Sequence, residues 1–141
     1  MTNPKVLSGK DTAIAAYESF KSRISLLSAN GITPGLCVVL VGEDPASQIY
    51  VRTKTKKLKS LGLKSKAIRL EDSVQESELI MIINDLNNDK SFHGILVQMP
   101  LPKHINSQNI INAIKPEKDV DGFHPENVGW LSIGKPRFIP C

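Results

Sequence analysis

The chain has 141 residues, of which 40% are hydrophobic and 23% charged, and a formal net charge of +4. This composition is typical of one globular domain with a substantial core, and no apolar run approaches the roughly 20 residues that span a bilayer. The first five residues lack the apolar segment of a secretory signal, and Cys37 and Cys141 do not form a disulfide framework. We therefore expect a soluble, cytoplasmic protein.

Helical and extended patterns alternate along the chain. Residues 36–41 form a continuous apolar run, which is typical of a strand buried in a parallel sheet. The first predicted elements are a helix over 9–29 ended by Gly31, a strand over 36–41 and a helix capped by Asp44 that ends near Gly62. They are followed by a strand over 64–70, a helix begun by Ser73 or Ser77, a strand over 94–98 and a short helix that Ser107 caps and that runs through Ile114. This alternation predicts an α/β fold of three layers, a parallel sheet flanked by helices.

From residue 115 onward the pattern changes. Residues 115–122 predict a turn-rich loop, and the tail from Trp130 to Cys141 shows neither a closing helix nor a closing strand. We expect one domain over residues 1–141, and we expect the natural protein to continue beyond it.

Tyr50 and Lys54 lie four residues apart on the second predicted helix, so their side chains share one face. A lysine beside an aromatic ring is a candidate general acid/base if its pKa is lowered. The alternative is a partly buried tyrosine and a surface lysine. The helix begins at the sheet edge where the carboxyl ends of parallel strands meet, and open α/β folds bind ligands there.

Gln98 ends the third predicted strand at the same edge, and its amide could bind Lys54 and water, or serve only the structure. Pro100 and Pro102 bracket Leu101 and predict a rigid loop that lines a flat ligand pocket. One of the X–Pro bonds could be cis, which the sequence does not decide.

Asp119 and Asp121 flank Val120, so in an extended segment their carboxylates would point the same way. One of them could accept paired hydrogen bonds from an amino-heterocycle, or it could cap the turn before Gly122. The string resembles a calcium loop, but the remaining ligands are missing, so we expect no metal. Together Tyr50, Lys54, Gln98 and Asp121 predict one active site.

Residues 52–69 contain no acidic side chain. The lysines of this stretch are Lys54, Lys56, Lys57, Lys59, Lys64 and Lys66. Such a run is either a solvated helix face or a surface for nucleic acid or another polyanion.

Three segments resemble the motifs of the bifunctional methylenetetrahydrofolate dehydrogenase/methenyltetrahydrofolate cyclohydrolase family. They are Val41–Ser47 followed by Tyr50 and Lys54, then Gly94–Pro102, and then Lys118–His124 followed by Asn127. The resemblance covers essentially the whole chain.

The resemblance implies that tetrahydrofolate derivatives are the partners, with neither nucleic acid nor membrane. It implies that Lys54 is the cyclohydrolase acid/base, that Gln98 positions it, and that Tyr50 stacks on the folate. It implies further that Asp121 holds the pterin ring and that Pro100 and Leu101 contact the substrate.

In this family, NADP or NAD oxidises 5,10-methylene- to 5,10-methenyl-tetrahydrofolate, which is hydrolysed to 10-formyl-tetrahydrofolate. The resemblance implies a homodimer whose nucleotide-binding domain follows these residues. We therefore expect the 141 residues alone to bind neither nucleotide and to oxidise no substrate. Two alternatives stay open: a folate-binding module without turnover, and a basic polyanion-binding domain whose binding would be sensitive to salt.

Overall fold

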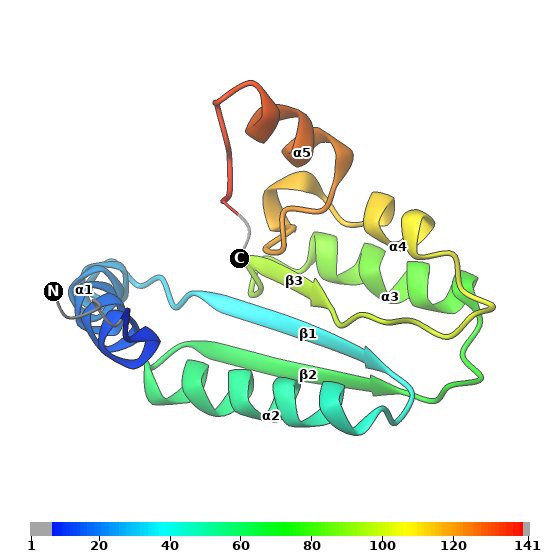
Figure 1. Cartoon of the computed structure of the whole chain (residues 1–141), viewed down its shortest axis with the longest axis horizontal. Coiled ribbons are helices and arrows are strands. Elements are labelled where there is room, and N and C mark those ends of the chain that lie inside the picture. The colour runs from blue at the N-terminus through cyan, green and yellow to red at the C-terminus, as the bar shows by residue number, and fades with distance from the viewer. Residues whose placement is uncertain (1–6, 140–141) are drawn as a thin grey trace, which may run out of the picture. The chain divides into compact units, whose positions relative to one another are not determined.

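A computed structural model describes residues 7–139 of the chain (Figure 1). The first five residues and Cys141, on which two expectations above depend, lie outside the described residues. The chain divides into two compact units, residues 1–33 and residues 34–141, and each is described by itself.

The described part of the first unit, residues 7–33, contains one helix, α1 (Gly9–Ala29). The Ser8 side chain begins the helix by accepting a hydrogen bond from the backbone N–H of Asp11 at 3.2 Å. Gly31, with a φ of 73°, ends it, and the Gly31 N–H donates to the carbonyl of Ser28. Glycine adopts this left-handed backbone without strain, so the predicted bounds of the helix and its glycine end are confirmed.

The second unit is built on a parallel sheet of three strands. They are β1 (Gly35–Val41), β2 (Lys64–Leu70) and β3 (Gly94–Val97). The order is β2-β1-β3, and Val39 of β1 stands opposite Ile68 of β2. The central strand, β1, is buried because β2 and β3 flank it and side chains pack on both faces of the sheet.

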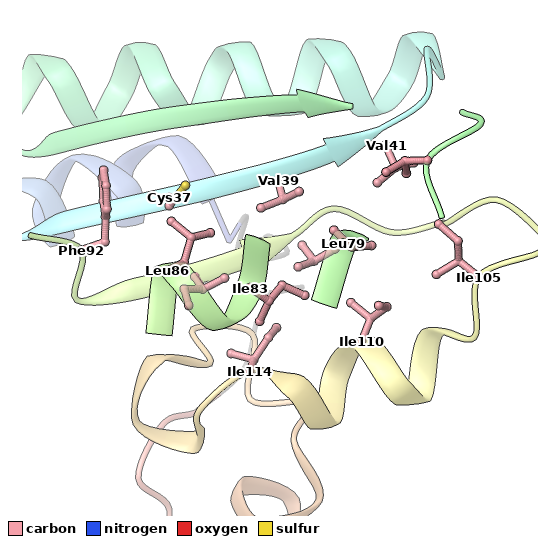
Figure 2. Packing of buried hydrophobic residues seen from close by; sticks show 13 residues of the cluster. Cys37, Val39, Val41, Leu79, Ile83, Leu86, Phe92, Ile105, Ile110 and Ile114 are labelled. Carbon is pink, nitrogen blue, oxygen red and sulfur yellow. The ribbon is translucent and has the colours of Figure 1, made fainter. Parts of the chain in front are cut away.

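Helices cover both faces of this sheet. One face carries α3 (Glu76–Asn88) and α4 (Ser107–Ala113), and the other carries α2 (Pro45–Ser60) (Figure 1). The hydrophobic core on the side of α3 and α4 includes Cys37, Val39, Val41, Leu79, Ile83, Leu86 and Ile110 (Figure 2). On the other face, Val51 of α2 packs against Val38. The predicted three-layer α/β fold is confirmed.

Two predicted helix starts were wrong. Gln75 is the N-cap of α3 and makes no side-chain cap bond, so neither Ser73 nor Ser77 begins this helix. Ser73 lies instead in the turn before α3, and Ser77 lies inside its first turn. Asn106, rather than Ser107, caps α4, because the Asn106 side chain accepts a backbone hydrogen bond at 2.9 Å.

The segment after α4 contains more regular structure than predicted. The expected loop includes a 3₁₀ turn, η1 (Pro116–Lys118), and a further helix, α5 (Pro125–Ser132), follows it. The His124 side chain caps α5 by accepting a bond from the backbone N–H of Glu126 at 3.1 Å. Proline in the first turn with an acidic residue beside it is a helix-start signal that predicts α5.

Replacing Ile83 with alanine is expected to lower the free energy of unfolding by about 2–5 kcal/mol, because Ile83 is fully buried between the sheet and α4. Urea denaturation measures this loss. Met81 lies on the same helix and is 61% exposed, so Met81→Ala should change stability by no more than about 0.5 kcal/mol. Equal losses in both variants would contradict the packing described for α3.

Candidate functional site

The turn from β1 into α2 fixes where the candidate site lies. Gly42 has a φ of 77°, and its N–H donates to the carbonyl of Leu70, which closes the end of β1 against β2. The Asp44 carboxylate then accepts a hydrogen bond from the Ser47 N–H at 2.7 Å and begins α2. Hydrogen bonds from the backbone and the side chain of Ser47 lower the pKa of the Asp44 carboxyl. The next two turns of α2 carry Tyr50 and Lys54.

The Lys54 ammonium lies over the Tyr50 ring, with Nζ 4.2 Å from the ring centroid. Tyr50 is 50% exposed and Lys54 is partly buried. A cation on an exposed aromatic face contributes about 0.5–1 kcal/mol. The contact orders the lysine and leaves half of the tyrosine surface open to a ligand.

Asp121 lies within electrostatic reach of this lysine. Burial raises the pKa of the Asp121 carboxyl, attraction to Lys54 lowers it, and repulsion from Asp119 raises it further. The structure thus brings together Tyr50 and Lys54 on α2 with a half-buried carboxyl from the loop after η1.

Asp119 and Asp121 do not form the carboxylate pair that an extended segment would give, because residues 119–122 form a turn. The Asp119 side chain is only 2% exposed, and its oxygens accept hydrogen bonds from the N–H groups of Gly122 and His124 and from the Asn127 amide. Asp119 is therefore the residue that caps the turn before Gly122. Asp121 keeps its carboxyl available at the site.

Gln98 follows the end of β3 at Val97, one residue earlier than predicted. Its N–H still donates to the Val39 carbonyl at 2.8 Å, and its side-chain Nε2 donates to the Met99 carbonyl at 2.8 Å. The side-chain Oε1 is buried without a hydrogen-bond partner. A buried acceptor left unpaired costs about 1–3 kcal/mol. Within the described residues no hydrogen bond joins Gln98 to Lys54.

The loop after Gln98 is exposed at one residue and partly buried at the next. The Met99–Pro100 bond is cis, which the sequence left undecided. Pro100 is exposed, whereas Leu101 is partly buried and packs against the core below α3. Leu101 therefore contributes to the core of the domain as well as to the loop.

Part of the basic run lines a depression of about 320 Å³ between α2 and β2. Its lining residues are Arg52, Thr55, Lys56, Lys59, Ala67 and Arg69. Lys54, which lies over the Tyr50 ring, does not line this depression. Lys64 contacts the Phe92 ring, with Nζ 4.4 Å from the centroid.

Within residues 7–139 no three histidine, cysteine, aspartate or glutamate side chains gather closely enough to hold a metal ion. No helix in this part of the chain is long and apolar enough to cross a membrane. Sequence reasoning gave no role to Asn127, although this residue is buried and binds Asp119. The sequence signal that could have identified Asn127 is its place after Lys118–His124 in the third family motif.

Known proteins resemble this chain over almost its whole length. Residues 7–121 match the family described as tetrahydrofolate dehydrogenase/cyclohydrolase, catalytic domain. The bifunctional protein FolD of Geotalea daltonii is 52% identical over 137 residues, which are 97% of this chain and 49% of that protein.

Solved structures agree with this match. The bifunctional enzyme FolD, a methylenetetrahydrofolate dehydrogenase/cyclohydrolase from Campylobacter jejuni, has a TM-score of 0.91 at 46% identity, covering 94% of this chain and 48% of its own. The Trypanosoma brucei enzyme, described as complexed with NADP cofactor and inhibitor, has a TM-score of 0.94 at 34% identity, covering 100% of this chain and 49% of its own. The chain spans about half the length of the relatives it matches.

Proposed function

Since the chain belongs to the tetrahydrofolate dehydrogenase/cyclohydrolase family through its catalytic domain, we propose that it binds tetrahydrofolate derivatives and performs one-carbon chemistry on them. In the whole protein, this chemistry is oxidation of 5,10-methylene-tetrahydrofolate and hydrolysis of the methenyl product to 10-formyl-tetrahydrofolate. The observation that supports the proposal most directly is the Lys54 ammonium held over the Tyr50 ring, within electrostatic reach of the Asp121 carboxyl.

Each of these three side chains suits one part of the substrate. The exposed half of the Tyr50 ring can stack on the aromatic portion of the folate. The Asp121 carboxylate can accept two N–H bonds from the amino-heterocycle of the pterin. In hydrolysis, a water oxygen bonds to the methenyl carbon and loses both of its protons as the bond from that carbon to N5 breaks. One proton ends on N5, and the other leaves to solvent with the positive charge of the methenyl compound. Lys54 is the group proposed to transfer these protons.

The unpaired oxygen of Gln98 supports a role beside Lys54. A buried acceptor without a partner is suited to take a hydrogen bond from an ammonium group or a bound water. We propose that Gln98 positions the lysine and the attacking water when the substrate closes the site.

The strand-to-helix turn after β1 reads Gly42-Glu43-Asp44 and lacks the glycine pattern that lets a backbone approach the pyrophosphate of a dinucleotide. We therefore derive no step of this chain through NADP or NAD. NADP or NAD as the oxidant of the whole protein, a homodimeric assembly and a cytoplasmic location are proposed from the family resemblance.

The proposal is tested by calorimetric titration of the chain with tetrahydrofolate under argon. Saturable binding is expected, and it should persist in an Arg52→Gln/Lys56→Gln variant that weakens the basic depression. Tight, salt-sensitive binding of an oligonucleotide without any binding of tetrahydrofolate would overturn the proposal in favour of a polyanion-binding role. If the chain binds folate but the whole protein does not hydrolyse the methenyl derivative, the chain is a folate-binding module without turnover.

The affinity for tetrahydrofolate is expected to fall on acidification. This fall should begin at a higher pH than it would if Asp121 had the pKa of an ordinary aspartate. The ionised Asp121 carboxylate accepts the proposed pterin bonds, and burial raises its pKa, so the ionised form is lost as the pH falls through this raised value. The same shift has the opposite sign for folding: the contribution of Asp121 to the stability of the folded state is fully present only below its ordinary pKa and is lost as the pH rises through the raised value. Titrations at several pH values measure the affinity, and Asp121→Asn should remove this acid limb.

A further inference from the structure

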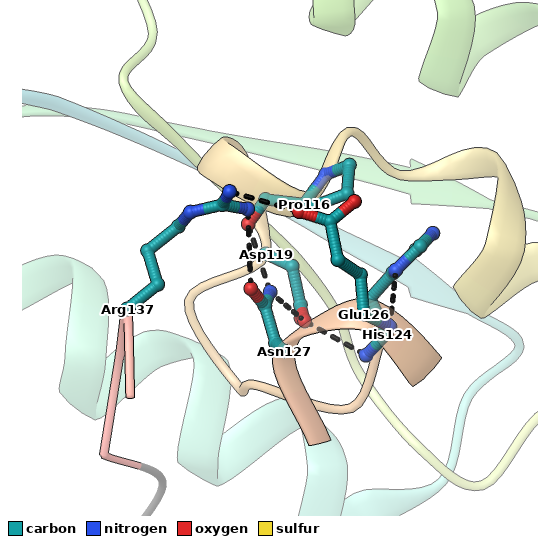
Figure 3. A network of polar contacts seen from close by, with 6 residues as sticks. All are labelled: Pro116, Asp119, His124, Glu126, Asn127 and Arg137. Carbon is teal, nitrogen blue, oxygen red and sulfur yellow. Dashed lines mark hydrogen bonds and ion pairs between the residues drawn. The ribbon is translucent and has the colours of Figure 1, made fainter. Parts of the chain in front are cut away.

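The loop that carries Asp121 is closed by a buried pair of side chains. Asp119 is 2% exposed and Asn127 is 1% exposed, and the Asn127 Nδ2 donates to Asp119 Oδ2 at 2.9 Å (Figure 3). The same Nδ2 group donates to the Pro116 carbonyl at 2.8 Å. Asn127 therefore ties the start of the loop, at η1, to its end, at α5.

Asn127 is in turn held from its other side. The Arg137 guanidinium donates to Asn127 Oδ1 at 3.3 Å and to a carboxylate oxygen of Glu126 at 2.8 Å (Figure 3). An amide whose oxygen is taken by a guanidinium must turn its NH₂ group the other way, toward Asp119 and Pro116. The network thus fixes the orientation of the amide as well as its position.

The residues on either side of Asp121 are anchored separately. Asp119 pairs with Ile95 in a parallel bridge beside β3. Val120 lies so close to Gly94 that a Cβ atom at position 94 would clash with the Val120 side chain. Gly122, with a φ of 69°, donates its N–H to the Asp119 carboxylate at 3.1 Å. Both neighbours of Asp121 are therefore held against fixed structure.

From this arrangement we infer that Asn127 is a positioning residue, which acts through Asp119 to hold the Asp121 carboxylate in its ligand-binding place. The inference depends on the proposed function, because it takes Asp121 as the carboxylate that binds the pterin. Paired hydrogen bonds to a planar heterocycle require the carboxylate to be held to within about 0.5 Å and 10–20°. Asn127 is the side chain that supplies this restraint, since the other N–H groups on Asp119 belong to the loop itself.

A looser loop would also change the electrostatic surroundings of Asp121. The charged groups that act on its carboxyl are Lys54 of α2 and Asp119 of the same loop. Burial is the largest cause of its raised pKa, so greater contact with water should return the pKa of Asp121 toward its ordinary value. This readout needs no ligand, and a purely structural role for Asn127 would not move it.

The test compares Asn127→Ala with the unaltered chain in two measurements. NMR titration of the Asp121 carboxyl carbon, assigned with the help of Asp121→Asn, should show a lower pKa in Asn127→Ala. Calorimetry with tetrahydrofolate should show binding weakened by roughly tenfold. In an Asp121→Asn background, Asn127→Ala should cause no further loss. Asn84, exposed on α3, provides the matched control, and Asn84→Ala should change neither quantity.

The outcomes separate the inference from the proposed function. If the unaltered chain does not bind tetrahydrofolate, or Asp121→Asn binds it as well as the unaltered chain, the proposed function fails. If Asp121→Asn weakens binding but folded Asn127→Ala keeps the parental pKa and affinity, the positioning role is overturned. An equal loss with and without the Asp121 carboxylate also overturns it. If Asn127→Ala does not fold, Arg137→Met serves in its place, because it removes the outer, partly exposed bond of the network. Arg137→Met should lower the pKa of Asp121 and weaken tetrahydrofolate binding by about two- to threefold. Parental values in Arg137→Met would then overturn the role.

Discussion

Replacing Lys54 with methionine is expected to slow hydrolysis of 5,10-methenyl-tetrahydrofolate by about 10²–10⁴-fold, while tetrahydrofolate binding is retained. Methionine keeps most of the packing of the lysine stem but removes the titratable nitrogen that lies 4.2 Å from the Tyr50 ring centroid. Hydride transfer should be less affected, because it moves no proton at the methenyl carbon. The rate is measured from the decay of methenyl absorbance, in a protein of the relatives' full length that carries this chain.

Lys56→Met is the matched control for this prediction. Lys56 lies on the same helix, is exposed, and lines the basic depression rather than the Tyr50 face. Its replacement should leave hydrolysis unchanged. A parental rate in Lys54→Met would show that Lys54 is a surface residue and that another group transfers the proton.

Replacing Asp121 with alanine should weaken tetrahydrofolate binding by about 10- to 150-fold while the fold is kept. Under the proposed assignment of Asp121, the variant leaves two N–H groups of the pterin without their charged acceptor, and such losses cost about 1.5–3 kcal/mol. Calorimetry measures the affinity, and Asp85→Ala, which removes an exposed carboxylate of α3, should have no effect. Unchanged affinity in Asp121→Ala would contradict the assignment.

Asp119 is the other carboxylate of this motif, and its replacement should have a different consequence. Its oxygens already accept three N–H groups of the protein, and its side chain is almost fully buried. Asp119→Ala would leave these donors unpaired inside the domain, so the loss should appear in the free energy of unfolding.

The elements that sequence predicted well are those determined by local signals. A continuous apolar run predicted β1, and glycines with positive φ ended α1 and α2 where the sequence placed them. The cap of α4 was missed by one residue because Asn106 and Ser107, both of capping residue types, are adjacent there. Asn106 takes the cap, and its N–H is also bound by Glu76 of α3, a contact that the local sequence does not contain.

The candidate site was predictable to the same extent. The Tyr50 and Lys54 contact follows from helical spacing alone. The different surroundings of Asp119 and Asp121 do not, because they depend on Asn127 eight residues beyond Asp119 and on a turn in place of an extended segment. Sequence therefore identified the motif, and the fold distinguished its two carboxylates.

The position of β2 at the margin of the sheet has a consequence for the behaviour of the protein at high concentration. Within the described residues β2 pairs only with β1, so its other side presents unpaired backbone groups that could recruit a strand from another molecule. Lys64, Lys66 and Arg69 are exposed along it. Two such strands placed side by side would bring like charges opposite one another, which opposes aggregation. The positive charge of this strand should therefore disfavour edge-to-edge association, a role that requires no anionic partner.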